Sequence, residues 1–79
     1  MAMKETANLQ NDMKKVSAED IKELRKLSKM SQRAFAEYFY ISTRTVEEWE
    51  GGRRNCPYGS FDLMRYKLEK EGIITLQEN

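Results

Sequence analysis

The side chains best suited to recognition chemistry lie in the middle of this 79-residue chain. Arg44 carries a planar guanidinium that can donate two parallel hydrogen bonds to guanine O6 and N7, a contact worth about 1–3 kcal/mol of discrimination. Thr43 can touch a thymine methyl group or a phosphate. Glu48 can accept a hydrogen bond from a cytosine amino group, or simply repel phosphate. This segment therefore holds candidate base contacts at Thr43, Arg44 and Glu48.

A cationic loop follows at residues 51–55, where two glycines precede Arg53, Arg54 and Asn55. Side chains of these types commonly bind the phosphates that position a protein on a duplex. We expect phosphate contacts from all three; the alternative is a solvated turn.

The residue inventory does not favour catalysis or metal binding. The chain has no histidine and one cysteine, Cys56, so no Cys/His metal site and no internal disulfide can form. Glu47 and Glu48 are sequence neighbours that diverge by about 100° around a helix, so they do not form a catalytic pair. We expect no enzyme activity and no cofactor, and we expect Cys56 to be a small buried or half-buried residue and not a reactive thiol.

Two short helices must position the recognition residues. Ser31 and Ser42 are candidate N-caps, because a serine hydroxyl can accept a hydrogen bond from a free backbone N–H of the first helical turn. Phe35, Ala36 and Phe39 share one face of the first of these helices. In the second, at about residues 43–50, Val46 and Trp49 share the buried face, which favours a core role for Trp49 over base stacking. This pattern is typical of a helix-turn-helix unit.

Two further helices flank this unit. The first begins at Ser17, where Asp20 completes a variant of the capping box, and its amphipathic face carries Ile21, Leu24, Leu27 and Ser28. The last follows Pro57 and runs to about residue 71, with Phe61, Met64 and Leu68 closing the core. Gly72 has the position of a left-handed C-terminal cap, with Ile73 packing back on Leu68. The predicted fold is all-α, a compact bundle of four to five helices.

The chain resembles the phage lambda-repressor-like helix-turn-helix family, often called the Xre family, and small single-domain bacterial members within it. The residues that carry the likeness are Leu24-Arg25, Ser31-Gln32, Phe35-Ala36, Ile41-Ser42, Thr45-Val46, Trp49-Glu50, Gly52-Arg53-Arg54 and Pro57. The resemblance implies duplex DNA binding, with the N-terminal part of the second helix of the unit at base edges in the major groove.

The resemblance also implies roles for individual residues. Arg25 is expected to form an ion pair with Glu50; a snorkelling arginine with its head in water is the alternative. Gln32 is expected to bind a backbone phosphate and to support the recognition helix, and Ser42 and Thr45 are further expected phosphate contacts near a helix N-terminus. The family's usual glycine in the turn is Tyr40 here, so either Tyr40 adopts a left-handed conformation or the turn is rearranged.

The net charge of +1 is low for a DNA-binding protein, but the charges are unevenly distributed. Residues 14–33 hold seven Lys and Arg against three Asp and Glu, and residues 53–71 hold five against three. We expect modest non-specific affinity with a steep dependence on salt. The alternative is that these charges belong to ordinary solvated helix faces.

The expected organisation is a flexible N-terminal arm at residues 1–16, a helix-turn-helix domain at residues 17–72 and an apolar tail at residues 73–79. Ile73, Ile74 and Leu76 in this tail could form a dimer contact or fold back onto the core. No apolar run approaches the length of a membrane span, and no export signal is visible, so we expect a cytoplasmic protein without a membrane partner.

Two hypotheses follow for function. The first is sequence-specific double-stranded DNA binding by a transcriptional regulator, acting as a homodimer on a palindromic site. The second is an antitoxin-type protein-interaction module that neutralises a toxin protein through its termini, with or without DNA autoregulation.

Overall fold

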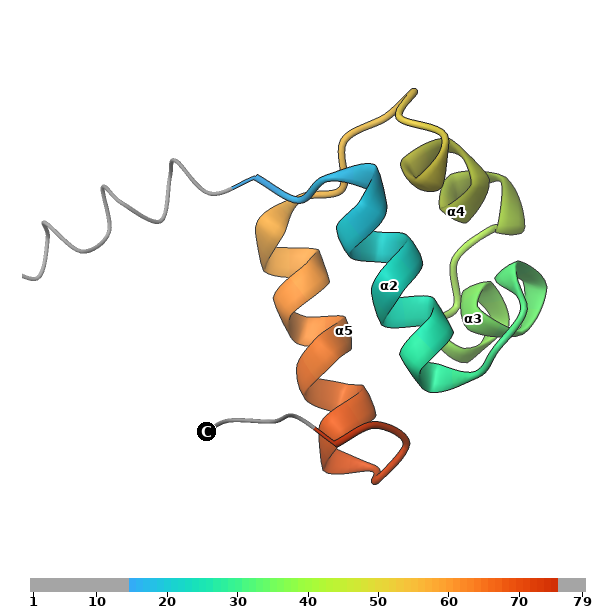
Figure 1. Ribbon diagram of the computed structural model, residues 1–79. Helices are drawn as coiled ribbons and strands as arrows, with labels where there is room; N and C mark the ends of the chain where they lie inside the picture. Colours follow the sequence, from blue (N-terminus) through green and yellow to red (C-terminus); the bar gives the residue numbers. More distant parts are fainter. Residues whose placement is uncertain (1–14, 76–79) are drawn as a thin grey trace, which may run out of the picture.

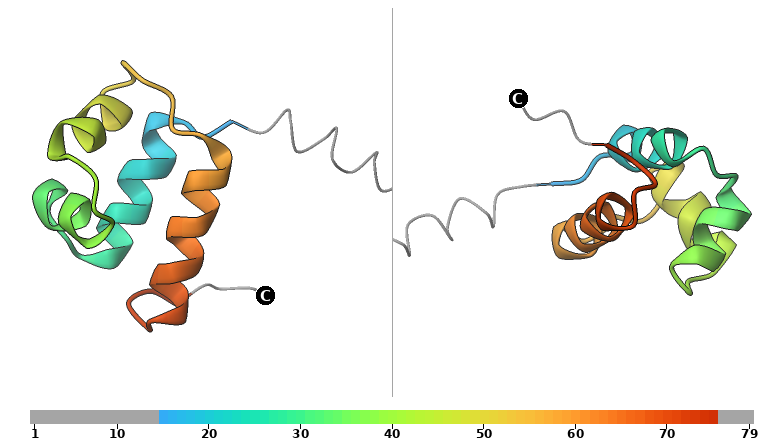
Figure 2. Two further views of the ribbon diagram at one scale, coloured as in Figure 1. Left: turned by 180° about the vertical axis from the view of Figure 1, so that it is seen from behind. Right: turned by 90° about the horizontal axis from the view of Figure 1, so that it is seen from below.

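The structure, a computed structural model, describes residues 15–75, and this part of the chain contains four α-helices and no strand. The helices are α2 (Ala18–Ser28), α3 (Gln32–Tyr38), α4 (Thr43–Glu50) and α5 (Tyr58–Lys70). α2 lies between α5 on one side and the pair α3 and α4 on the other (Figure 1). Two further views show the same order (Figure 2). The prediction of a small all-α fold is confirmed.

Serine is the N-cap residue of three of the four helices. Ser17, Ser31 and Ser42 each accept a hydrogen bond from the backbone N–H three residues later, at 3.0 Å in all three cases. At α2 the expected capping box is complete, because the Ser17 N–H also donates to the Asp20 carboxylate at 2.9 Å. α5 starts directly after Pro57 without a side-chain cap. These caps explain why the helix starts could be located from the sequence.

All four helices end in the same type of turn. In each, one residue has a positive φ, and the next N–H donates to the carbonyl five residues back, as in a Schellman motif. The four residues with positive φ are Lys29 (61°), Tyr40 (58°), Gly52 (76°) and Gly72 (75°). The left-handed cap expected at Gly72 is confirmed. Of the two alternatives for the turn between α3 and α4, the first holds: Tyr40 adopts the left-handed conformation, and the turn is not rearranged.

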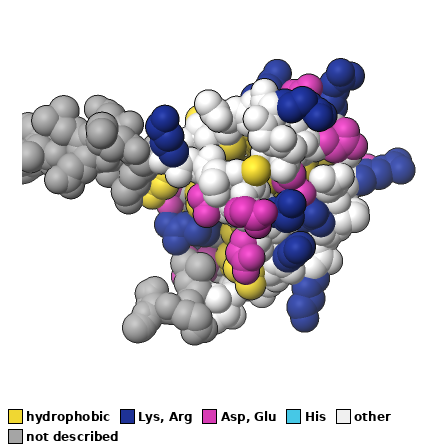
Figure 3. Space-filling view, turned by 45° about the horizontal axis from the view of Figure 1, so that its top comes forward, with side chains coloured by type: hydrophobic (Ala, Val, Ile, Leu, Met, Phe, Trp, Pro, Cys, Tyr) yellow, Lys and Arg dark blue, Asp and Glu magenta, His cyan; other side chains and the backbone are white. Residues whose placement is uncertain are grey.

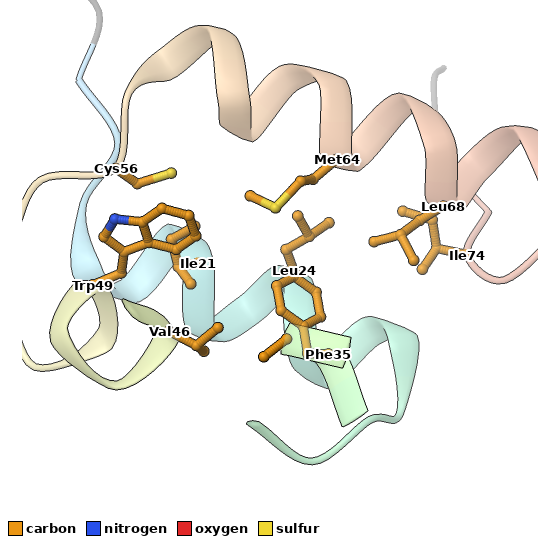
Figure 4. Packing of buried hydrophobic residues seen from close by; sticks show 10 residues of the cluster. Ile21, Leu24, Phe35, Val46, Trp49, Cys56, Met64, Leu68 and Ile74 are labelled. Carbon is orange, nitrogen blue, oxygen red and sulfur yellow. The ribbon is translucent and has the colours of Figure 1, made fainter. Parts of the chain in front are cut away.

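The core is built from apolar side chains of all four helices and of the segments that flank α5 (Figure 4). Trp49 and Cys56 lie together at one end of the cluster, and Leu68 and Ile74 lie at the other. Cys56 is buried, as expected. The fully or nearly fully buried apolar residues are Ile21, Leu24, Phe35, Ala36, Val46, Trp49, Cys56, Met64, Leu68 and Ile74.

One expected core residue is exposed. The periodicity of α2 places Leu27 on its buried face, but 51% of the Leu27 surface is accessible. Leu27 lies about 60° around the helix from Leu24, away from Ser28, on a flank that stays open to solvent. The amphipathic face of α2 is therefore narrower than predicted, and it consists of Ile21, Leu24 and Ser28.

Both ends of the described segment join the helical core. Val16 forms an isolated antiparallel bridge with Cys56 and packs against the core. Ile74 is only 5% exposed, and its N–H, like that of Ile73, donates to the Leu68 carbonyl. Of the two alternatives for the tail, folding back is the one that holds for Ile73 and Ile74. Residues 1–14, with most of the expected N-terminal arm, and Leu76 lie outside the described residues.

Candidate nucleic-acid interface

α4 is attached to the rest of the molecule by one face. Val46 is fully buried and Trp49 is 7% exposed, and α4 packs against both α3 and α2. Burial of a large apolar side chain stabilises the folded state by about 1.5–3 kcal/mol. These two residues therefore fix the rotation of α4 about its axis, which decides the side chains that it presents outward.

A charged network fixes the C-terminal end of α4 to α2. Arg25 donates from Nε to Glu50 Oε2 at 2.7 Å and from Nη2 to Glu50 Oε1 at 3.0 Å. Its Nη1 donates to the carbonyl of Met30 at 3.1 Å, and the Gln32 amide donates to Glu50 Oε1 at 3.1 Å. The pair expected between Arg25 and Glu50 is therefore present, with bidentate geometry.

The environment of Glu50 affects its ionisation in two opposing ways. The side chain is 5% exposed, and this burial alone would raise its pKa. The hydrogen bonds from Arg25 and Gln32, with the charge of Arg25, outweigh burial and hold the pKa of Glu50 below its ordinary value. The hydrogen bonding that Arg25 donates to Glu50 is also the main reason that the pKa of Arg25 is raised. Both groups therefore stay charged, and the network persists at neutral pH.

Of the three candidate base contacts, Thr43 and Arg44 lie in the first turn of α4, and Glu48 lies one turn further along the helix. The side chain of Arg44 is 82% exposed, whereas that of Glu48 is 23% exposed. Thr43, the first residue of the helix, is half-buried. Arg44 donates from Nε to Glu48 Oε2 at 3.3 Å, four residues along the same helix. This i, i+4 pairing leaves the terminal Nη groups of Arg44 at the surface.

The start of α4 is organised by Ser42 and Thr45. The Ser42 hydroxyl accepts from the Thr45 N–H and lies 2.9 Å from the Thr45 hydroxyl. Ser42 is exposed and Thr45 is half-buried. The Ser42 hydroxyl, which is expected to bind phosphate, thus caps the helix, and the Thr45 hydroxyl contacts it. The N-terminus of α4 remains open to an anion.

The cationic loop returns alongside α4. Arg54 lies with Nε 3.4 Å from Glu48 Oε1, so Glu48 forms ion pairs with two arginines of different segments, and only the pair with Arg44 is also a hydrogen bond. Arg53 and Asn55 are exposed, and the Arg53 side chain forms no ion pair within residues 15–75. The side chain of Arg54 is thus paired with α4, whereas those of Arg53 and Asn55 form no such pair in the part of the chain that the structure describes.

Charges of both signs are interspersed on this side of the molecule. In Figure 3, which brings the loop between α4 and α5 forward, Lys and Arg side chains alternate with Asp and Glu. The excess of Lys and Arg counted in residues 14–33 and 53–71 therefore does not form a purely cationic surface on this side. Non-specific attraction to phosphate is correspondingly reduced.

An apolar groove of about 470 Å³ lies beside the candidate interface. It is bounded by the turn between α3 and α4, by Trp49 and by the first half of α5. Leu63, at its edge, is 70% exposed. A groove of this kind could accept an apolar side chain of another protein.

The structure brings most of the expected site residues into two groups. The outer group is Thr43, Arg44, Glu48 and Arg54; the inner group, which supports α4 from behind, is Arg25, Gln32 and Glu50. The resemblance implies a phosphate contact for Gln32, but one of its amide N–H groups is used by Glu50. The pairing of Arg44 with Glu48 is not among the sequence predictions, although the i, i+4 spacing indicates it. The contact of Arg54 with Glu48 has no such signal, because it depends on the chain reversal at Gly51 and Gly52.

Comparisons with protein-family models, with curated proteins and with solved structures find no match for this chain. Among the helices of residues 15–75, none has both the length and the apolar character needed to cross a membrane. The same residues contain no group of three or more Cys, Asp or Glu side chains that could hold a metal ion.

Proposed function

We propose that this chain binds double-stranded DNA with sequence specificity and regulates transcription in the cytoplasm as a homodimer. The proposed reading element is α4, with its N-terminal half in the major groove. One observation carries this proposal. α4 is fixed by its inner face and by the Arg25–Glu50–Gln32 network, while its outer face presents Arg44 to solvent beside an open helix N-terminus.

The chemistry of the outer face fits DNA better than it fits a small ligand. The terminal Nη groups of Arg44 match the two acceptors of guanine in the major groove. The N-terminus of α4 and the loop cations can then bind phosphates on either side of the groove. A single unit of this size makes few base contacts, so we propose a symmetric dimer whose half-sites lie about one helical turn apart.

Selection from a randomised duplex library tests this proposal and defines the preferred operator in the same experiment. The full chain is used to enrich duplexes, and the enriched duplex is compared with a scrambled duplex of the same composition by fluorescence anisotropy. We expect Arg44→Ala to weaken binding of the enriched duplex by about 5- to 150-fold, the equivalent of 1–3 kcal/mol. Binding of the scrambled duplex should change only a few-fold.

Arg65→Ala is the matched control. Arg65 is also an arginine paired with an acid on its own helix, at 2.5 Å from Asp62, but it lies on α5. The control should leave the preference for the enriched duplex unchanged. Failure to enrich any sequence, or equal effects of the two substitutions, would contradict the proposal.

A protein-interaction module of the antitoxin type is the second candidate, and the apolar groove favours it. Leu63 is 70% exposed at the groove edge, more than Leu27 at 51%, and it lies beside other apolar side chains that line the groove. Co-expression with a toxin encoded beside the gene, followed by co-purification of wild type and Leu63→Asp, tests this candidate. Loss of the complex in the variant supports it, and absence of any complex with wild type contradicts it.

A further inference from the structure

Glu48 occupies the centre of a three-residue charge cluster on the proposed DNA-facing side. One carboxylate oxygen, Oε2, lies 3.3 Å from Arg44 Nε, and the other, Oε1, lies 3.4 Å from Arg54 Nε. The Glu48 side chain is 23% exposed, whereas those of Arg44 and Arg54 are 82% and 58% exposed. The acid is thus the least accessible member of the cluster.

The backbone reinforces this arrangement. The N–H groups of Arg53 and Arg54 both donate to the Glu48 carbonyl, at 2.9 and 3.3 Å. Gly52, with φ of 76°, allows the chain to reverse there. The loop is therefore held against α4 at Glu48 by main-chain and side-chain contacts together. Arg54 is placed beside the reading helix before any ligand arrives.

Glu47, the neighbouring residue, provides the contrast. It is exposed on the same helix and carries the same charge, but it forms no side-chain hydrogen bond or ion pair within residues 15–75. If the only role of a carboxylate here were to lower the positive charge of this surface, Glu47 and Glu48 would serve equally well. The pairing with two arginines is specific to Glu48.

We propose that Glu48 is a positioning residue that sets the sequence specificity of the reading helix, an inference that rests on the proposed DNA binding. It pairs with both arginines through their Nε atoms, by a hydrogen bond from Arg44 and an ion pair with Arg54, so their terminal Nη groups stay available for a ligand. Arg44 is then oriented for a bidentate contact with guanine. The same carboxylate restrains both arginines from binding phosphates indiscriminately, so it lowers affinity for unrelated DNA.

This role differs from the direct contact with cytosine expected from the sequence. Both carboxylate oxygens already interact with an arginine, so the acid acts through Arg44 and Arg54. Exposed ion pairs contribute little to folding stability. The informative readouts are therefore the salt dependence of binding and the ratio of specific to non-specific affinity.

The experiment compares Glu48→Gln with Glu47→Gln in the full chain. Both substitutions remove one negative charge from the outer side of α4, and only the first breaks the cluster. Each protein is titrated with the enriched duplex and with a scrambled duplex at several salt concentrations between about 50 and 200 mM. Each phosphate contact adds about 0.9 to the slope of log K against log salt.

We expect Glu48→Gln to steepen the slope for the scrambled duplex by up to about two, because two arginines are released to phosphates. The loss of affinity between about 50 and 200 mM salt then becomes about tenfold larger than in wild type. The preference for the enriched duplex should fall by about three- to tenfold. Glu47→Gln should raise both affinities by a similar small factor and leave the ratio unchanged.

Two further readouts separate positioning from a change in total charge. In an Arg54→Gln background, Glu48→Gln should add about one to the slope instead of two, since only Arg44 remains to be released. In ¹⁵N spectra, the Nε–H resonances of Arg44 and Arg54 should move together in Glu48→Gln and stay in place in Glu47→Gln.

The outcomes distinguish this inference from the proposed function. If wild type binds duplexes with a preference, but Glu48→Gln matches Glu47→Gln in slope, ratio and spectra, the positioning role is refuted while DNA binding stands. If wild type binds no duplex at about 50 mM salt, DNA binding is refuted and this inference with it.

Discussion

Replacement of Glu50 by alanine should destabilise the protein strongly, although the residue lies on a short helix near the surface. The substitution removes the acceptor of three hydrogen bonds, two from Arg25 and one from Gln32. It leaves the Arg25 guanidinium, whose side chain is 18% exposed, without its counter-charge. The carbonyl of Met30 remains as the one acceptor described for that group.

The magnitude follows from the burial of this pair. Breaking a fully buried ion pair by removing one partner costs about 3–5 kcal/mol. Because Arg25 keeps some access to water, we expect about 2–4 kcal/mol for Glu50→Ala. A domain of this size has a total stability of only about 5 kcal/mol or somewhat more. The variant should therefore be close to its unfolding transition at 37 °C.

The assay is a double-mutant cycle of urea denaturation curves at 10 °C with Arg25→Ala, Glu50→Ala and the double variant. We expect the double variant to be about 2 kcal/mol more stable than the sum of the single losses predicts. Arg25→Met combined with Glu50→Leu should recover most of the wild-type stability, because two apolar side chains leave no unpaired charge. A coupling energy below about 0.5 kcal/mol would refute the argument that this network fixes α4 to α2.

The pH dependence gives an independent test. The folded-state pKa of Glu50 lies below its ordinary value of about 4.5. The stability that the ionised group provides is therefore fully present above about pH 4.5 and is lost as the pH falls through the lower folded-state value. The difference in unfolding free energy between wild type and Glu50→Gln should shrink on acidification below about pH 4.5. A constant difference between pH 7 and pH 3 would contradict this assignment.

Three further predictions concern the turns, the tail and the thiol. Tyr40→Gly should stabilise the protein by about 0.5 kcal/mol, because relief of the left-handed strain outweighs the greater conformational freedom of the unfolded chain. Tyr40→Ala keeps the strain and should show no gain in thermal denaturation. Ile74→Ala should cost about 2–5 kcal/mol in urea denaturation because the side chain is 5% exposed, whereas Leu63→Ala, at 70% exposed, should cost less than about 0.5 kcal/mol. Burial raises the pKa of Cys56 to about 11, so a thiol reagent at pH 8 should react at least about tenfold more slowly with the native protein than in urea. Because the thiol of the unfolded chain ionises near its ordinary value of 9.0, stability should also fall as the pH rises from there, and Cys56→Ala should remove this loss.

The boundaries of the helices could be predicted because they depend on short-range chemistry. The three serines cap helices through a backbone N–H three residues away, so a window of four residues contains the whole interaction. The periodicity of Val46 and Trp49 likewise identifies the inner face of α4, and thereby its outer face with Arg44. The pair of Arg25 and Glu50 follows only from the family resemblance, since its partners are 25 residues apart.

Other features needed the tertiary structure because they depend on how separate segments meet. Whether Leu27 is buried is decided by the width of the surface that α2 shares with its neighbours. The conformation of Tyr40 is decided by the packing of α3 against α4, since an isolated tyrosine disfavours a positive φ by about 1–2 kcal/mol. The position of Ile74 is decided by the space that remains beside Leu68.

The sequence by itself determined that the chain forms short capped helices, which side of each faces inward, and that catalytic histidines and a cysteine–histidine metal site are absent. These properties follow from local hydrogen bonding and helical periodicity, which act over a few residues. Only the tertiary structure decided that Glu48 joins Arg44 to Arg54, that Glu50 is the residue of α4 to which Gln32 donates, and that the tail returns to the core. Each of these contacts depends on a chain reversal between helices, and the direction of such a reversal is set by the packing of the whole domain.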